Sequence, residues 1–213
     1  AEIELLYTQS NLKEILEKEN FDHFSFDFYS DTITNDSTGL TERETARRAY
    51  KMAKEFVADF DNSFQNLFFY GDTGVGKTFL SHCIAHDLLD SAHCVLYFSS
   101  FELFDFLAGS AFSRGSDAPD DEPIFDCDLL IIDDLGIERS TEFALEQVFN
   151  VIDSRYRSKL PLIVTTNMTL EELKNPQDLT RSRIYDRVLE RCVPLRINNQ
   201  NIRQRNAAES MKE

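Results

Sequence analysis

Residues 70–79 read YGDTGVGKTF, and this stretch decides the fold class because it has the spacing G-x-x-x-x-G-K-[ST] of a phosphate-binding loop. In such a loop the glycines let backbone N–H groups turn toward the phosphates of a nucleotide, and the following helix adds the positive end of its dipole. Lys77 should reach the β- and γ-phosphates, and the Thr78 hydroxyl should coordinate Mg²⁺. The predicted nucleotide-binding residues are Gly71, Asp72, Thr73, Gly74, Val75, Gly76, Lys77, Thr78 and Phe79.

Around this loop, short apolar runs alternate with longer helical patterns. The apolar runs predict strands at residues 66–70, 94–99, 128–133, 162–166 and 193–197. The helical patterns predict helices at residues 41–60, 77–90, 100–108, 141–158 and 179–191. Capping boxes of the form T-x-x-E should start helices at Thr41 and Thr169, and residues 109–123 should form a polar loop. The alternation predicts an α/β fold with a parallel sheet that helices cover on both faces.

The N-terminal part has a different pattern. Residues 3–18 show a loose helical periodicity, and the aromatic residues of 20–32 lack helical spacing, which predicts an extended segment packed on the domain. We therefore expect two regions: residues 1–40 as a helix and linker, and residues 41–213 as the nucleotide-binding domain. The first residue is not Met, which suggests a trimmed chain from which an N-terminal module is missing.

Composition narrows the class of protein. The chain has 213 residues, of which 42% are apolar, and this is typical of a globular domain. It contains no apolar run of about 18 residues and no signal peptide, so we expect no membrane association. Four widely spaced cysteines are expected to be reduced thiols, which favours a cytoplasmic location. The net charge of −16 argues against nonspecific coating of DNA.

Two further strands end in polar residues. The string CDLLIIDD at 127–134 places Asp133 beside the Mg²⁺, through water, and Asp134 where it can orient or deprotonate an attacking water. The string LIVTTN at 162–167 places Asn167 near the γ-phosphate. The alternative for each is that the polar residues serve only the turn that follows the strand.

A helix rich in arginine comes last. The string TRSRIYDRVLERC at 180–192 contains Arg181, Arg183, Arg187 and Arg191 at near-helical spacing. One interpretation is a basic, solvated helix. The other is that one guanidinium reaches the nucleotide site of a neighbouring subunit, where it would stabilise transition-state charge.

These strings in this order resemble the AAA+ ATPases of the DnaC/DnaI helicase-loader group and the related IstB transposition helpers. The resemblance rests on YGDTGVGKTFLSHCIAHDLL, VLYFSSFELFDFL, DLLIIDDLG, VTTN and SRIYDRV, and it covers about residues 20–205. It implies a P-loop fold with strand order 5-1-4-3-2 and no C-terminal helical lid. It also implies that Asn167 senses the γ-phosphate, that Arg187 is an arginine finger acting in trans, and that Arg203 contacts the nucleotide in cis.

The resemblance further implies a biological role. It predicts an ATPase that needs ATP and Mg²⁺, is weak unless assembled, and loads the replicative hexameric helicase. The expected partners are that helicase, single-stranded DNA, and further copies of the chain that associate through the nucleotide site. In 101–116, exposed phenylalanines could stack on bases, although core packing is favoured for Phe104 and Phe106. We expect residues 21–29 to form a wall of the adenine pocket.

Other functions remain as alternatives. The chain could be an IstB-like transposition helper, or an ATP-gated adaptor with negligible hydrolysis. A small-molecule kinase is disfavoured because the 109–123 loop is acidic and would repel phosphates. A GTPase is disfavoured because no N-K-x-D string occurs.

Overall fold

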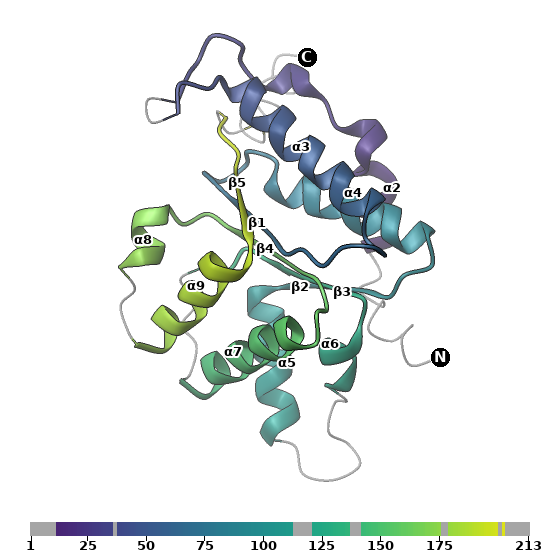
Figure 1. Ribbon diagram of the computed structural model, residues 1–213, viewed down its shortest axis with the longest axis vertical. Helices are drawn as coiled ribbons and strands as arrows, with labels where there is room; N and C mark the ends of the chain where they lie inside the picture. Colours follow the sequence, from purple (N-terminus) through teal and green to yellow (C-terminus); the bar gives the residue numbers. More distant parts are fainter. Residues whose placement is uncertain are drawn as a thin grey trace.

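The computed structural model describes residues 12–35, 38–112, 121–136, 142–175, 179–199 and 202. Its centre is a five-stranded sheet in the order β2-β3-β4-β1-β5 (Figure 1). All neighbouring strands are parallel. The strands are β1 (Leu67–Tyr70), β2 (Val95–Ser99), β3 (Leu129–Asp133), β4 (Leu162–Thr166) and β5 (Val193–Arg196). Both the α/β class and the predicted strand order are confirmed.

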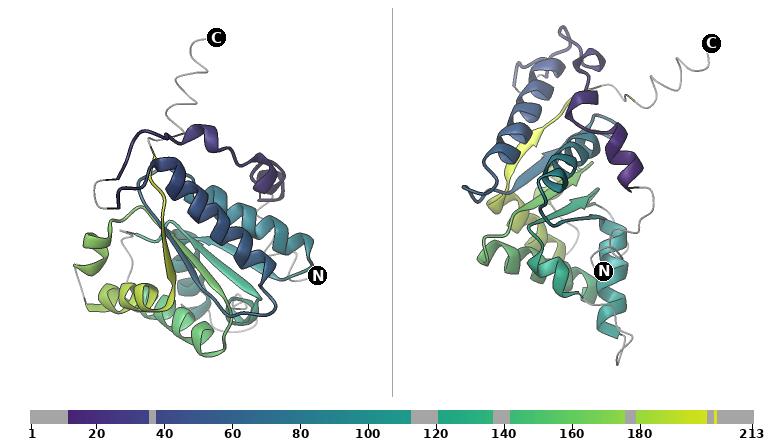
Figure 2. Two further views of the ribbon diagram at one scale, coloured as in Figure 1. Left: turned by 45° about the horizontal axis from the view of Figure 1, so that its top comes forward. Right: turned by 90° about the vertical axis from the view of Figure 1, so that its right-hand side faces the viewer.

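Helices cover both faces of the sheet, as Figures 1 and 2 show. One face carries α2 (Leu12–Lys18), α3 (Glu42–Ala58) and α4 (Lys77–Asp90). The other carries α5 (Ser100–Phe112), α6 (Glu122–Asp126), α7 (Glu142–Arg157) and α9 (Leu179–Arg191). The short α8 (Leu170–Lys174) packs against α9. No helix in these ranges is long and apolar enough to cross a membrane.

The four strands β1 to β4 read as largely apolar runs because helices cover both of their faces. Successive side chains of a strand point to opposite faces. Phe68, Ile132 and Val164 therefore join the core under α5 and α7, whereas Phe69 and Ile131 join the core under α3 and α4. The sheet separates two hydrophobic cores, and the edge strand β5 alone of the five alternates between buried and exposed side chains.

The prediction of a polar loop at residues 109–123 was wrong at both ends. Helix α5 continues to Phe112, past the expected end at residue 108, and α6 begins at Glu122, before the expected end of the loop. A proline lies in the first turn of α6, where its missing N–H leaves no hydrogen bond unmade. The two predicted capping boxes are present, because Glu44 and Glu172 accept from the backbone N–H groups of Thr41 and Thr169.

The N-terminal segment packs on the domain as expected, but it is not extended throughout. It contains two 3-10 turns, η1 (Phe21–His23) and η2 (Phe26–Phe28), which begin at the side-chain caps Asn20 and Ser25. Phe21 and Tyr29 are buried in the same core as the alanines of α3. Arg43 on α3 donates from Nε to the carbonyls of Phe26 and Tyr29, which fixes the segment against the domain.

A buried arginine joins three elements on the opposite face. Arg155 on α7 is 0% exposed, and its guanidinium donates to the carbonyls of Ile124, Cys127 and Pro161 at 3.0, 2.9 and 2.8 Å. These acceptors belong to α6, to the segment before β3 and to the segment before β4. One planar donor group therefore bonds buried carbonyls from three separate segments of the chain.

We expect Arg155→Met to lower the free energy of unfolding by about 3 kcal/mol, because several buried carbonyls would lose their donors. Denaturant unfolding followed by circular dichroism measures this change. The matched control is Arg157→Met, two residues along the same helix, where the side chain is 73% exposed. Equal unfolding midpoints for the two variants would contradict the role given to Arg155.

Candidate nucleotide site

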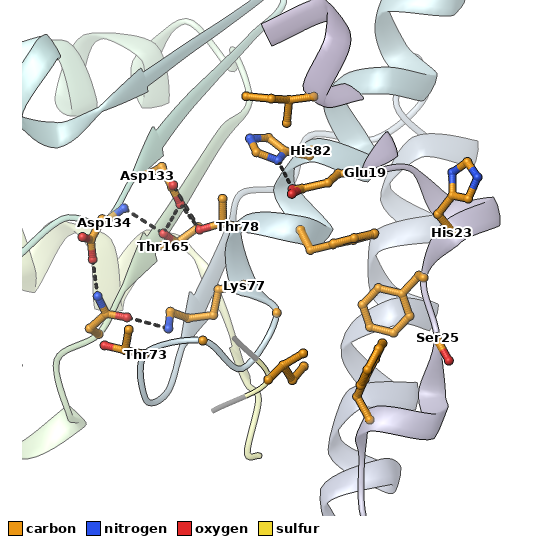
Figure 3. Close-up of a pocket in the computed structure, with 18 of the residues that line it drawn as sticks. Glu19, His23, Ser25, Thr73, Lys77, Thr78, His82, Asp133, Asp134 and Thr165 are labelled. Atoms are coloured by element: carbon orange, nitrogen blue, oxygen red, sulfur yellow. Dashed lines mark hydrogen bonds and ion pairs between the residues drawn. The ribbon is translucent and has the colours of Figure 1, made fainter. Parts of the chain in front are cut away.

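The phosphate loop lies between β1 and α4, at the carboxyl ends of the strands, beside a cavity of about 510 Å³ (Figure 3). Residues of the loop form one side of this cavity. The ends of β3 and β4 form a second side, and the N-terminal segment forms a third. Such a crevice at the carboxyl edge of a parallel sheet is the usual ligand site of this class of fold.

The loop depends on glycine at places where a side chain would not fit. Gly76 has φ 108°, and a Cβ there would collide with the hydroxyl of Tyr29. Tyr29 is 2% exposed and its hydroxyl donates to the carbonyl of Val75 at 2.8 Å. Burial raises the pKa of Tyr29, so this hydroxyl stays protonated and remains a donor. The N-terminal segment is thereby attached directly to the phosphate loop.

The chain beyond β5 supports the loop from its other side. A Cβ on Gly71, which has φ 143°, would collide with the carbonyl of Ile197. Ile197 itself donates to the carbonyl of Tyr70, and the N–H of Ile202 donates to the carbonyl of Gly74 at 3.0 Å. The loop is thus held between the two ends of the described chain.

Lys77 is the first residue of α4 and is only 5% exposed. Its Nζ donates to the carbonyls of Gly71 and Asp72 at 2.9 and 2.7 Å, and to Oδ1 of Asn167 at 2.7 Å. The ammonium group is therefore placed inside the loop, facing the ends of the neighbouring strands. From this position the ammonium group can contact the phosphates of a nucleotide.

Oxygen ligands suited to Mg²⁺ begin at the next residue of α4, Thr78. The Thr78 hydroxyl is 3.1 Å from both carboxylate oxygens of Asp133, at the end of β3. Hydroxyl and carboxylate oxygens are what Mg²⁺ prefers in proteins, and it usually keeps several waters beside them. The donor set therefore fits the ion expected to accompany a nucleoside triphosphate.

Asp134 and Asn167 complete the polar set. The side-chain amide of Asn167 donates to Oδ1 of Asp134, so that Lys77, Asn167 and Asp134 form a continuous hydrogen-bonded chain. Figure 3 shows the two ends of this chain, Lys77 and Asp134, beside Thr78 and Asp133. Asp134 also borders a second cavity of about 440 Å³, together with Phe101 and Glu172. The structure therefore brings together the predicted residues Lys77, Thr78, Asp133, Asp134 and Asn167.

The two predicted arginines are placed differently. Arg187 on α9 pairs with Asp153 and Glu190 at 3.6 and 3.0 Å, and its guanidinium lies 5.8 Å from the ring centre of Phe149. It does not line either cavity as far as the chain is described. Arg203 lies outside the described residues. The role of Arg187 in trans stays a prediction.

Several residues that line the cavity were not predicted individually. Phe24, Phe28 and Tyr29 lie in the 21–29 segment proposed as a wall of the adenine pocket, but Glu19, His82 and Thr165 were missed. Glu19 and His82 contact each other, with Oε2 and Nδ1 2.5 Å apart. No local pattern marks Glu19, because it reaches the cavity only through the packing of α2 on α4. Thr165 could have been found, since it belongs to the same strand end as Asn167, two residues before it.

Comparison with known proteins agrees with this geometry. The family described as IstB-like ATP binding protein matches residues 40–210. The replicative helicase loader DnaC of Escherichia coli (strain K12) is 27% identical over 150 residues, which cover 69% of this chain and 59% of that protein. The replicative helicase loader DnaI of Bacillus subtilis (strain 168) is 26% identical over 169 residues, which cover 70% of this chain and 53% of that protein.

A crystal structure of DnaI superposes with a TM-score of 0.62 at 26% identity, covering 89% of this chain and 92% of that chain. The chain spans only 59% and 53% of the lengths of the two curated relatives above. The family match nevertheless includes the phosphate loop and every strand of the sheet. The chain belongs to the IstB-like ATP binding protein family and is a P-loop domain of the AAA+ type shared with the DnaC and DnaI loaders.

Proposed function

We propose that this chain binds and hydrolyses ATP, and that it acts in the cytoplasm as a loader of the replicative hexameric helicase. ATP would switch its grip on the helicase and on single-stranded DNA. The observation that carries the ATPase assignment is the convergence of Lys77, Asp134 and Asn167 on one cavity beside the Thr78–Asp133 pair. The relatives DnaC and DnaI are both replicative helicase loaders, and this favours the replication role.

Each residue has a distinct part in this proposal. Lys77 binds the β- and γ-phosphates, and Thr78 and Asp133 hold Mg²⁺, the latter through water. The ion, when bound, neutralises charge on the phosphate oxygens. Asp134 orients the attacking water or accepts its proton, and Asn167 keeps the Asp134 carboxylate and the Lys77 ammonium in fixed relation. Phe24, Phe28 and Tyr29 line the cavity and would form a wall of the adenine pocket.

One aromatic residue supports a contact with single-stranded DNA. Phe104 is 6% exposed in the core and Phe106 packs against that core, so the favoured structural role of both is confirmed. Phe101 is 71% exposed, at the start of α5 and at the edge of the second cavity. An exposed ring can stack on a base without reading its identity. We therefore propose Phe101 as the base-stacking residue.

The alternatives are a transposition helper and an adaptor with negligible hydrolysis. We expect single-stranded DNA or the host's hexameric helicase to raise ATP turnover several-fold, because alignment of subunits completes the site. Turnover is measured with each partner, and helicase capture is measured with and without ATP. ATP-dependent capture of a transposase in place of the helicase would favour the transposition helper. Tight ATP binding with no turnover under any condition would favour the adaptor.

Asp134→Asn should keep the affinity for ATP and slow hydrolysis by roughly 10²-fold or more, because it removes a general base or water-positioning group. Asparagine adopts the left-handed backbone of this position readily, so the local fold should survive. ATP-dependent thermal stabilisation and turnover measure the two effects. The control Lys77→Ala should lose the thermal stabilisation. If Asp134→Asn loses binding but hydrolyses what it binds, Asp134 is a metal ligand and the roles of the two aspartates are reversed.

Arg187 should act on the nucleotide of a neighbouring subunit, since its side chain faces α7 of its own chain. Arg187→Ala should hydrolyse ATP poorly alone, and hydrolysis per wild-type subunit should rise with protein concentration. Mixing Arg187→Ala with Lys77→Ala should restore part of the activity, because one variant supplies the phosphate loop and the other the arginine. If mixing restores nothing where the wild type assembles, the finger is not Arg187 or is not supplied in trans.

A further inference from the structure

The hydroxyl of Thr165 lies between the two aspartates at the end of β3. Thr165 is on the central strand β4 and is 1% exposed. Its Oγ1 donates to Oδ1 of Asp133 at 2.5 Å and accepts the backbone N–H of Asp134 at 2.8 Å. A single buried hydroxyl is thus bonded to the side chain of one aspartate and to the backbone of the other.

Asp134 needs such support because its backbone is unusual. Its φ of 59° is in the left-handed region, which aspartate adopts more easily than most residues with a side chain but less easily than glycine. A residue stays in this conformation only when its surroundings hold it there. Relaxation to an extended backbone would turn the carboxylate toward another side of the strand end.

The contacts that hold Asp134 come from strands on either side of β3. Thr165 on β4 accepts its N–H, and Ser100, directly after β2, donates from Oγ to its carbonyl at 2.9 Å. The next residue, Leu135, donates its N–H to the carbonyl of Thr165 at 2.8 Å. Thr165 therefore fixes the backbone at Asp134 and at the residue that follows.

We infer that Thr165 is a positioning residue for hydrolysis, which sets the direction of the Asp134 carboxylate and orients Asp133 toward the Mg²⁺ site. The inference rests on the proposed ATPase function. If the hydroxyl only satisfied buried polar groups, its removal would lower the stability of the fold. It would not lower kcat while leaving KM for ATP unchanged. The two roles therefore differ in what they do to kcat and KM.

The test uses Thr165→Val, which keeps the branched shape and removes the hydroxyl, and Thr165→Ser, which keeps the hydroxyl. At saturating Mg²⁺, kcat of Thr165→Val should fall about 10- to 100-fold with KM for ATP little changed, as for loss of a group that orients a metal-site ligand. Thr165→Ser should recover most of the rate. The Mg²⁺ concentration that gives half of the ATP-dependent thermal shift should rise in Thr165→Val and return in Thr165→Ser.

Thr45→Val is the matched control. Thr45 is also buried and its hydroxyl donates to the carbonyl of Glu42 at 2.8 Å, but it lies on α3 and does not line the cavity. It should lower the melting temperature and leave kcat unchanged. If Thr165→Val does not fold, Thr165→Ala replaces it, with the same expected loss of kcat.

Three results would overturn the inference: kcat of Thr165→Val close to wild type, no recovery in Thr165→Ser, or an equal loss of kcat in Thr45→Val. An unchanged Mg²⁺ requirement in Thr165→Val would overturn the part that concerns Asp133. A wild-type chain that hydrolyses no ATP, even with DNA and helicase, would instead overturn the proposed function on which the inference rests.

Discussion

The position of β1 between β4 and β5 is the constraint on which the site depends. Because parallel strands end at the same edge, the phosphate loop after β1 lies next to Asn167 after β4, and the aspartates of β3 lie one strand further. Lys77 can therefore contact Asn167, 90 residues away in the sequence. A strand order that separated β1 from β4 would leave the lysine without this partner. Burial of both faces favours this order, since β1, β2, β3 and β4 each supply side chains to both cores and the edge strand β5 supplies Leu195 to one of them.

Residues whose role depends on a short local pattern could be predicted from the sequence. Lys77 and Thr78 follow from loop spacing, and Asp133, Asp134 and Asn167 follow from their places at strand ends. Helix starts at Thr41 and Thr169 were predictable because a capping box is a contact between residues three apart. The strand order came from the family resemblance, because apolar runs show where strands lie and not which of them pair.

Residues brought to the site by tertiary packing could not be predicted in the same way. Tyr29 reaches the carbonyl of Val75 across 46 positions, and Glu19 reaches His82 across 63. The 3-10 turns were missed because their caps, Asn20 and Ser25, lie in an aromatic stretch whose spacing has no regular period. Helix α6 was missed because its burial comes from Ile124 and from the contacts of Arg155, and both depend on α7.

To act on the nucleotide of a neighbouring subunit, as proposed, Arg187 must give up its contacts with α7 of its own chain. Arg183 and Arg187 lie over the ring of Phe149, and Arg191 lies over Tyr156, so the helix is held to α7 by cation–π contacts. Such contacts at partly exposed positions contribute about 0.5–1 kcal/mol each. The Arg187 pairs with Asp153 and Glu190 are at the surface and are worth about 1 kcal/mol or less. In the proposed arrangement, a γ-phosphate in the cleft of a neighbouring chain would offer Arg187 a bidentate partner of higher charge. Giving up these weak contacts would cost Arg187 little free energy, while the contacts of Arg183 and Arg191 would keep the helix in place.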